Sequence, residues 1–118
     1  MPKRNPPYLS AFTLVEIMVV VVIIGLLASL AVPAFQKVRA TAQDKAVMNN
    51  ARQLSAAADQ YFLDNGATIV AKTTLVSAGG YMRVLTAAAN ETYPDNYTDG
   101  ITITITGIAG ARTVTYAP

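Results

Sequence analysis

A long apolar run near the start of the chain contains a single charged side chain, Glu16. The run covers residues 12–32, with the sequence FTLVEIMVVVVIIGLLASLAV. As an α-helix, which rises about 1.5 Å per residue, it would be about 32 Å long, enough to cross a hydrocarbon core of about 30 Å. Residues 17–27 would be apolar on every side of that helix, so lipid or other apolar helices must cover them. This run therefore predicts one membrane-spanning helix.

Residues 1–11, MPKRNPPYLSA, precede this run and contain two cations and three prolines. We interpret them as a polar leader. The whole chain has nine basic and seven acidic side chains, and without Lys3 and Arg4 the count is seven against seven. The positive charge that often indicates nucleic-acid binding thus belongs to the leader. No aromatic residues interleave with the four cations of the predicted helix, Lys37, Arg39, Lys45 and Arg52, as a base-stacking surface requires. We therefore expect no nucleic-acid partner.

The chain has no cysteine and no histidine. This composition excludes disulfides, thiol chemistry, a Ser–His–Asp triad and any Cys/His zinc site. Residues 95–100 resemble the first half of a calcium loop, but Tyr97 stands at a ligand position and Thr106 stands where a bidentate Glu is needed. A turn is the better interpretation, because Asn, Asp and Gly favour turns. We expect no catalytic residues, no metal, no cofactor and no enzymatic activity.

The helix is predicted to continue beyond the apolar run. Pro33 interrupts the pattern, but residues 34–65 contain no further Gly or Pro. Apolar side chains recur there at helical spacing, which predicts an amphipathic helix. These side chains are Val47, Ala51, Leu54, Ala58, Tyr61 and Phe62. Asn65 and Gly66 form a typical helix end, so we predict one helix from about residue 12 to residue 64, bent or loosened near Pro33.

The C-terminal residues 66–118 are predicted to form a small β-structure. Residues 101–106 alternate strictly between Ile and Thr, and residues 112–116 alternate again, which is typical of two half-buried strands. With the Gly-containing loop 107–111 between them they would form an antiparallel hairpin. The apolar face of this hairpin and the apolar stripe of the helix need each other, which predicts an α+β fold with a long helix packed on a small antiparallel sheet. Residues 90–100 are predicted to be a polar loop, and residues 68–75 and 81–85 fit either short extended pieces or a helical turn.

Glu16 is the most informative residue for function. A carboxylate within a spanning helix is unfavourable and needs a cationic partner or a helix N-terminus nearby. If the chain is cut before Phe12, the new α-amino group lies four residues from Glu16. The carboxylate could then pair with the amine of its own chain, or with the amine of a neighbouring chain and so set the register between stacked helices.

The segment Ala11-Phe12-Thr13-Leu14-Val15-Glu16, preceded by a short basic leader and followed by an apolar run, resembles the N-terminus of type IV pilins and type II secretion pseudopilins. The resemblance implies that a prepilin peptidase cuts between Ala11 and Phe12 and that the new amino group of Phe12 is methylated. It also implies that Glu16 is the assembly residue and that Gly25 and Pro33 loosen the helix. The family usually has Gly just before the cut, and this chain has the small residue Ala11 instead.

The resemblance implies three segments: a cleaved leader at 1–11, a transmembrane and assembly helix at 12–33, and a periplasmic or extracellular head at 34–118. It implies a single-pass protein of the bacterial inner membrane with a cytoplasmic N-terminus, later part of a filament. The implied partners are other copies of the chain, related pilin-like subunits, prepilin peptidase, an inner-membrane assembly platform and the lipid bilayer. The absence of cysteine favours a pseudopilin or a small disulfide-free pilin, so the leading hypothesis is a subunit of a type II secretion pseudopilus.

Four alternatives stay open. The first is a subunit of a surface type IV pilus, used for adhesion, motility or DNA uptake, and the second is a membrane-anchored binding module that never polymerises. The third is a secretory signal peptide cut after Ala31, although the apolar run exceeds the usual 7–15 residues. The fourth is a plain membrane anchor, which leaves Glu16 unexplained. The cations on either side of the run are balanced, so charge alone does not set the orientation.

Overall fold

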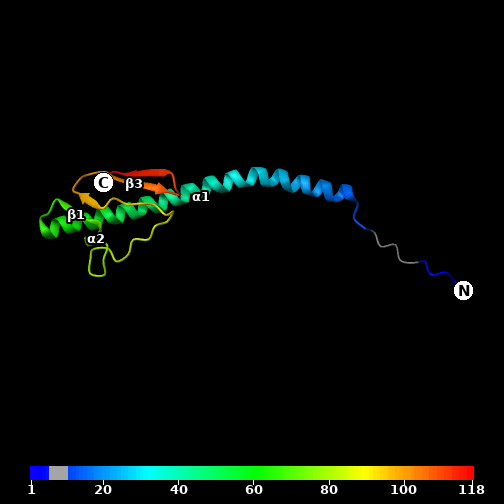
Figure 1. Cartoon of the computed structure of the whole chain (residues 1–118), viewed down its shortest axis with the longest axis horizontal. Helices are drawn as coiled ribbons and strands as arrows, with labels where there is room; N and C mark the ends of the chain where they lie inside the picture. The colour runs from blue at the N-terminus through cyan, green and yellow to red at the C-terminus, as the bar shows by residue number, and fades with distance from the viewer. Residues whose placement is uncertain (6–10) are drawn as a thin grey trace. The chain divides into compact units, whose positions relative to one another are not determined.

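The structure of the chain is a computed structural model that describes residues 1–5 and 11–118. Residues 6–10 of the predicted leader lie outside the described residues. The chain divides into two compact units, Met1–Lys37 and Val38–Pro118. The elements follow in the order α1, β1, α2, β2, β3 and β4 (Figure 1), and each unit is described here by itself.

Helix α1 covers Leu14–Asn65 and continues through Pro33. It ends as the sequence predicts, because Gly66 adopts a left-handed φ of 64° and donates its N–H to the carbonyl of Phe62 at 2.8 Å. A residue without Cβ takes that conformation without strain. The predicted single long helix is therefore confirmed to within two residues at its start and one at its end.

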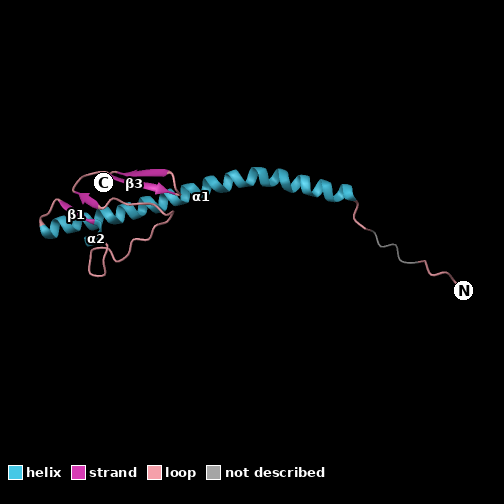
Figure 2. Cartoon of the chain, in the orientation of Figure 1, coloured by secondary structure: helices cyan, strands magenta, loops and turns pink. Residues whose placement is uncertain are grey.

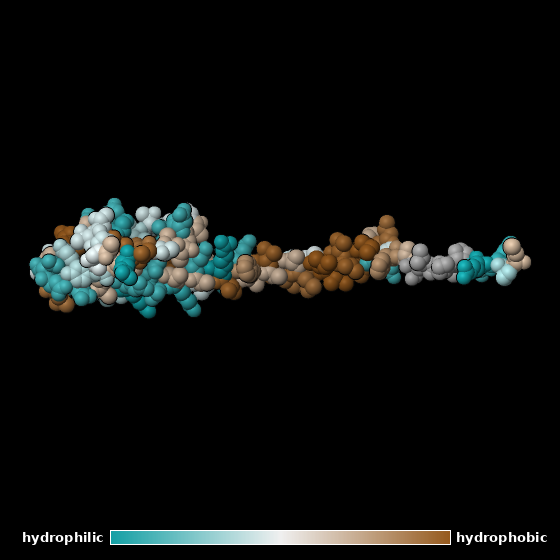
Figure 3. Space-filling view, turned by 90° about the horizontal axis from the view of Figure 1, so that it is seen from below, coloured by the Kyte–Doolittle hydropathy of each residue, from teal (hydrophilic) through white to brown (hydrophobic). Residues whose placement is uncertain are grey.

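In the unit Met1–Lys37 the apolar side chains of α1 are exposed rather than buried. Figure 3 shows hydrophobic side chains along this part of the helix on the face in view. Among the described residues, α1 is the one helix long and apolar enough to cross a membrane. None of the described residues of this unit removes that surface from water, so lipid or other helices must do so.

The unit Val38–Pro118 contains two small antiparallel sheets beside the second half of α1 (Figure 2). In the first sheet, β1 (Ile69–Ala71) pairs with β2 (Asn96–Thr98). In the second, β3 (Ile103–Ile108) pairs with β4 (Arg112–Tyr116), with Ile105 opposite Val114. The short helix α2 (Lys72–Leu75) follows β1 directly.

The predicted hairpin is present, but its first strand differs from the prediction in its bounds and in a register shift. Strand β3 begins at Ile103 and extends to Ile108, and a register shift between Ile105 and Ile108 accommodates Gly107 at a φ of 73°. The register shift is an irregularity of the bulge type, where an extra residue with positive φ fits best as Gly.

Strand β2 lies inside the segment 90–100, which was predicted to be a loop. Residues 69–75, which the sequence left undecided, form both an extended piece and a helical turn.

The hydrophobic core lies between α1 and the strands. Helix α1 contributes apolar side chains spaced three and four residues apart, and the hairpin contributes its alternating isoleucines. The two predicted apolar faces therefore pack against each other. The fully buried large side chains are Leu54, Leu75, Ile105, Ile108 and Val47. This packing confirms the α+β fold with the long helix on small antiparallel sheets.

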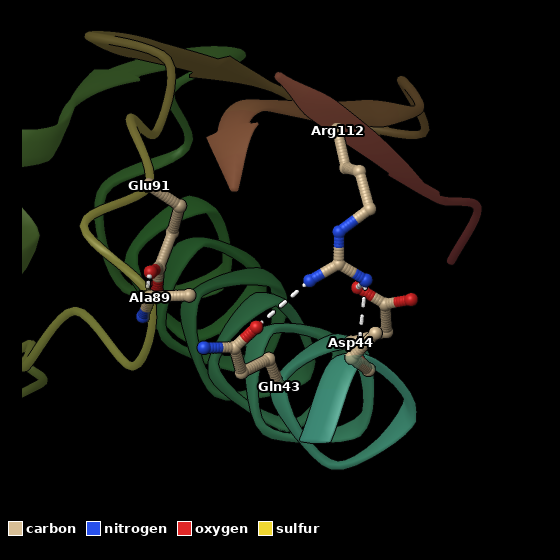
Figure 4. Close-up of polar contacts among 6 residues, drawn as sticks. Gln43, Asp44, Ala89, Glu91 and Arg112 are labelled. Atoms are coloured by element: carbon tan, nitrogen blue, oxygen red, sulfur yellow. Dashed lines mark hydrogen bonds and ion pairs between the residues drawn. The ribbon is translucent and has the colours of Figure 1, made fainter. Parts of the chain in front are cut away.

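Polar contacts of one side chain hold the hairpin against α1 within the unit Val38–Pro118, which is called the head from here on (Figure 4). Arg112 of β4 donates from Nη1 to Asp44 at 2.7 Å and to the carbonyl of Ala40 at 3.2 Å. Its Nη2 donates to Gln43 Oε1 at 2.8 Å. The planar fork of one guanidinium can satisfy several acceptors at once, so Arg112 ties the end of the hairpin to α1.

Glu91 fixes the loop before β2. Its side chain is buried, and its carboxylate accepts hydrogen bonds from the backbone N–H groups of Ala88 at 3.0 Å and Ala89 at 2.7 Å and from the hydroxyl of Tyr93 at 2.7 Å. Asn50 of α1 donates to that same hydroxyl at 3.1 Å. Burial acts to raise the pKa of Glu91, but the hydrogen bonds from Tyr93, Ala88 and Ala89 outweigh it, and the pKa lies below its usual value.

Candidate assembly site at the start of α1

The first turn of α1 carries a reciprocal pair of hydrogen bonds between Thr13 and Glu16. The backbone N–H of Thr13 donates to Glu16 Oε2 at 2.8 Å, and the N–H of Glu16 donates to Thr13 Oγ1 at 3.2 Å. This is a capping box, in which a hydroxyl residue before the helix and an acidic residue three positions later satisfy two otherwise unpaired N–H groups. It explains why the helix begins at Leu14.

The capping box also explains how a carboxylate is accommodated at the edge of an apolar helix. Glu16 lies in the first turn, where the positive end of the helix dipole favours an anion. Among the described residues no cation forms an ion pair with it. One oxygen is held by Thr13, and no hydrogen bond to Oε1 is recorded within the described part of the chain. The carboxylate is thus fixed in position while keeping capacity for a further donor.

Ala11 and Phe12 lie just before the helix in irregular, exposed backbone. The side chain of Phe12 is 85% exposed. A peptidase must bind the backbone on both sides of the bond that it cuts, and an exposed non-helical segment permits this. The N–H of Phe12 is an ordinary amide in the uncut chain, so the pairing of Glu16 with a free Phe12 amine remains a prediction.

An open apolar groove of about 850 Å³ lies along the first turns of α1. It is lined by Phe12, Thr13, Leu14, Ile17, Met18, Val21 and Val22. One of these residues, Thr13, belongs to the capping box itself, and Phe12 directly precedes it. An apolar side chain from another helix could therefore pack directly beside Glu16 and exclude water from it, which would strengthen any ion pair that it makes.

The remaining predicted site residues lie further along α1. A Cβ added at Gly25 would meet nothing within 4 Å, and Pro33 lies inside the helix. Both lower the intrinsic stability of a helix at their positions, so their predicted role in loosening it stands as a prediction. The described residues contain no group of three or more acidic side chains that could hold a metal ion.

Thr13 is a site residue that the sequence interpretation missed. The signal was present, because Thr13 and Glu16 have the spacing of the capping-box pattern and precede an apolar run. The predicted stabilisation of Glu16 by a cation or a helix N-terminus is met in part by the N-terminus of α1, where Thr13 is the specific donor. Arg112 has partners 68 to 72 positions away, which the local sequence does not indicate. The partners of Glu91 are near in the sequence, but they are backbone N–H groups and a hydroxyl that the chain brings together only when it folds.

Comparison with known proteins finds relatives in two related filament systems. The chain is 34% identical over 115 residues to fimbrial protein EcpC of Eikenella corrodens, an alignment that covers 85% of this chain and 75% of EcpC. It is 36% identical over 89 residues to type II secretion system core protein G of Klebsiella pneumoniae, covering 75% of this chain and 59% of that protein. It is 40% identical over 57 residues to the type IV major pilin protein PilE of Neisseria gonorrhoeae, covering 48% of this chain and 34% of PilE. No family model matches the chain, and no solved structure gives a significant match.

Proposed function

The chain belongs to the family of type IV pilins and type II secretion pseudopilins, and from this premise we propose that it is a structural subunit of a type II secretion pseudopilus. Its family and its membrane-capable helix make it a pilin-like filament subunit that associates with other pilins. The assignment to a secretion system is supported by the similarity to core protein G in two organisms. We propose a structural rather than a catalytic role.

Processing is the first proposed step. The precursor inserts with its leader in the cytoplasm, and a prepilin peptidase cuts between Ala11 and Phe12 and methylates the new amine. The exposed, non-helical backbone at Ala11 and Phe12 supports this step. The product keeps α1 as a single-pass anchor in the inner membrane, with the unit Val38–Pro118 outside.

Assembly is the second proposed step, together with an inner-membrane platform. Apolar helices leave the lipid and bundle together, and burial of apolar surface contributes about 25 cal/mol per Å². The Phe12 amine of a neighbouring subunit approaches the free oxygen of Glu16 and forms an ion pair in an apolar surrounding. The observation that carries this proposal is the capping box, which presents the carboxylate in a fixed position at the start of an uncovered apolar helix.

Substitution of Glu16 tests the assembly step. We expect Glu16→Ala to insert into membranes normally but to give few filaments, because the amine of the incoming subunit would find no anion. Ser29→Ala is a matched control, since Ser29 is another polar side chain of the same apolar helix and donates its hydroxyl to the backbone carbonyl of Leu26. The measurement is the amount of subunit in sheared or pelleted filaments relative to membrane-bound subunit. A normal filament yield from Glu16→Ala would contradict the mechanism.

The processing step is tested by N-terminal sequencing and intact mass of the purified subunit. We expect the mature chain to begin at Phe12, with a methyl group on its amine. A chain beginning at Val32 would indicate an ordinary secreted domain. An intact Met1 would indicate a membrane anchor that is not processed, with Ala11 as the residue that prevents cleavage.

A surface type IV pilus is the second candidate function. The similarity to fimbrial protein EcpC favours it, because that alignment covers 85% of this chain. The two functions differ in what a deletion removes. Loss of secretion of exported proteins would indicate a pseudopilus, whereas loss of filaments recovered by shearing intact cells, with normal secretion, would indicate a surface pilus.

A further inference from the structure

The part of α1 inside the head has an exposed stripe of side chains that do not belong to the hydrophobic core. Its residues follow one another at alternating spacings of four and three, which places them along one side of a helix. All are exposed, and they are Lys45, Asn49, Arg52, Ala56, Asp59 and Leu63. The side chains packed under the strands, such as Val47 and Leu54, lie on another side of the same helix.

The three charges on this stripe have no ionic partner among the described residues. The two ion pairs of the head are Lys72 with Asp95 and Arg112 with Asp44. Lys45, Arg52 and Asp59 are therefore available, and they are spaced by seven residues each. Seven residues make about two helical turns, or about 10.5 Å along the axis.

The order of these charges restricts how two copies can lie side by side. If two parallel copies lie side by side with no axial displacement, each charged residue faces the same residue of the neighbouring copy, and like charges repel. A displacement of seven residues pairs Arg52 with Asp59 but also places Lys45 against Arg52. A displacement of fourteen residues, about 21 Å, pairs Lys45 with Asp59 and brings no like charges together.

We propose that this stripe is a contact surface between copies of the chain, in which Lys45 of one copy pairs with Asp59 of a copy displaced by four helical turns. The inference rests on the proposed function, since parallel α1 helices around a common axis bring such stripes together. The charges then help to set the axial displacement between subunits, and the small side chain of Ala56 allows close approach of the helices.

Charge exchange in the full-length chain tests the contact, with the chain expressed beside a prepilin peptidase and a filament-assembly machinery. Lys45→Glu and Asp59→Lys should each lower filament yield, by about two- to five-fold for one exposed ion pair. The double variant K45E/D59K should restore it. The matched control is R52E/D59K, which exchanges charges seven residues apart and should not restore the yield. All these side chains are exposed, and thermal unfolding followed by circular dichroism checks that each variant folds.

Cysteine crosslinking supplies a second measurement, because the chain has no cysteine of its own. In the variant K45C/D59C the two thiols of one chain are about 21 Å apart, beyond the limit of about 7 Å between Cα atoms of a disulfide. Oxidised filaments should therefore give a ladder of covalent oligomers. The variant T102C/T106C, with one exposed position just before β3 and one within it, is the control for random crosslinking and should give no such ladder.

The outcomes separate this inference from the proposed function. If the unchanged chain forms no filaments, the proposed function fails. If it forms filaments and the charge variants assemble normally, only the contact is overturned. Rescue by R52E/D59K alone would overturn the four-turn displacement, and loss of membrane association without rescue by K45E/D59K would show that Lys45 contacts lipid headgroups instead.

Discussion

Two carboxylates of this chain, Glu16 and Glu91, are held by hydrogen-bond donors rather than by cations. The carboxylate of Glu16 accepts from the backbone N–H of Thr13, just before its own helix, and that of Glu91 accepts from two loop N–H groups and the hydroxyl of Tyr93. At the residue scale the two differ in exposure, since Glu91 is 7% exposed whereas Glu16 is exposed. The buried carboxylate is therefore structural, and the exposed one can accept a partner.

Glu91 makes the head sensitive to acid. A carboxylate whose pKa is lower in the folded than in the unfolded chain stabilises the fold fully above its unfolded pKa, which is about 4.3 for Glu. That contribution is lost as the pH falls through the folded pKa. We expect Glu91→Gln to lower the free energy of unfolding at neutral pH by about 1–3 kcal/mol, because the amide nitrogen replaces an acceptor of a buried hydrogen bond.

The measurement is thermal or urea unfolding of the detergent-solubilised chain between neutral pH and about pH 3. The unchanged protein should lose stability below about pH 4, and Glu91→Gln should lose less of it. Asp99→Asn, at an exposed position of the same head, is the control and should keep the original profile. An identical acid profile for Glu91→Gln would contradict the assignment.

At the element scale, α1 serves two environments with one continuous helix. Its first part presents apolar side chains on every side, and its second part buries a stripe under the strands and leaves another stripe in water. Leu54 and Leu63 lie on these two stripes of the second part. Leu54 is 0% exposed and Leu63 is 85% exposed.

This pair allows a matched test of where the core lies. Leu54→Ala should lower the free energy of unfolding of the head by about 2–5 kcal/mol, because it removes buried methyl groups and leaves a cavity. Leu63→Ala should change it by no more than about 0.5 kcal/mol, as is usual for exposed positions. Chemical denaturation in detergent, with the head followed by tyrosine fluorescence, measures both. Equal effects of the two substitutions would contradict the placement of the core.

At the scale of the whole molecule, the core residues all belong to the unit Val38–Pro118. The unit Met1–Lys37 contributes no buried side chain among its described residues. The head therefore contains its own hydrophobic core and the hydrogen bonds of Arg112 and Glu91. The apolar helix before it is free to be covered by lipid or by neighbouring subunits.

We expect a chain truncated to residues 38–118 to fold in aqueous buffer without detergent. It keeps every residue of the core and the contacts of Arg112 and Glu91. The full chain should need detergent, because its exposed apolar helix would aggregate in water. Circular dichroism and dispersed amide signals in NMR measure folding of the truncated chain. A truncated chain that is unfolded in buffer would show that the apolar segment contributes to the stability of the head.

Local patterns in the sequence were sufficient for the features that depend on neighbours along the chain. The apolar run fixes the membrane-capable helix, the three-and-four spacing fixes the buried stripe with Leu54, and the Ile/Thr alternation fixes the hairpin. Gly66 ends the helix because glycine adopts a positive φ without strain. The spacing of Thr13 and Glu16 likewise specifies the capping box.

Only the tertiary structure decided the features that depend on residues distant in the chain. Strand β2 is three residues long in a segment rich in Asn and Asp, and it is a strand because it pairs with β1. Arg112 reaches Asp44 across 68 positions, and Glu91 reaches α1 through Tyr93 and Asn50. Short strands and buried polar contacts gain their stability from partners that folding brings together, and the local sequence does not encode which partners these are.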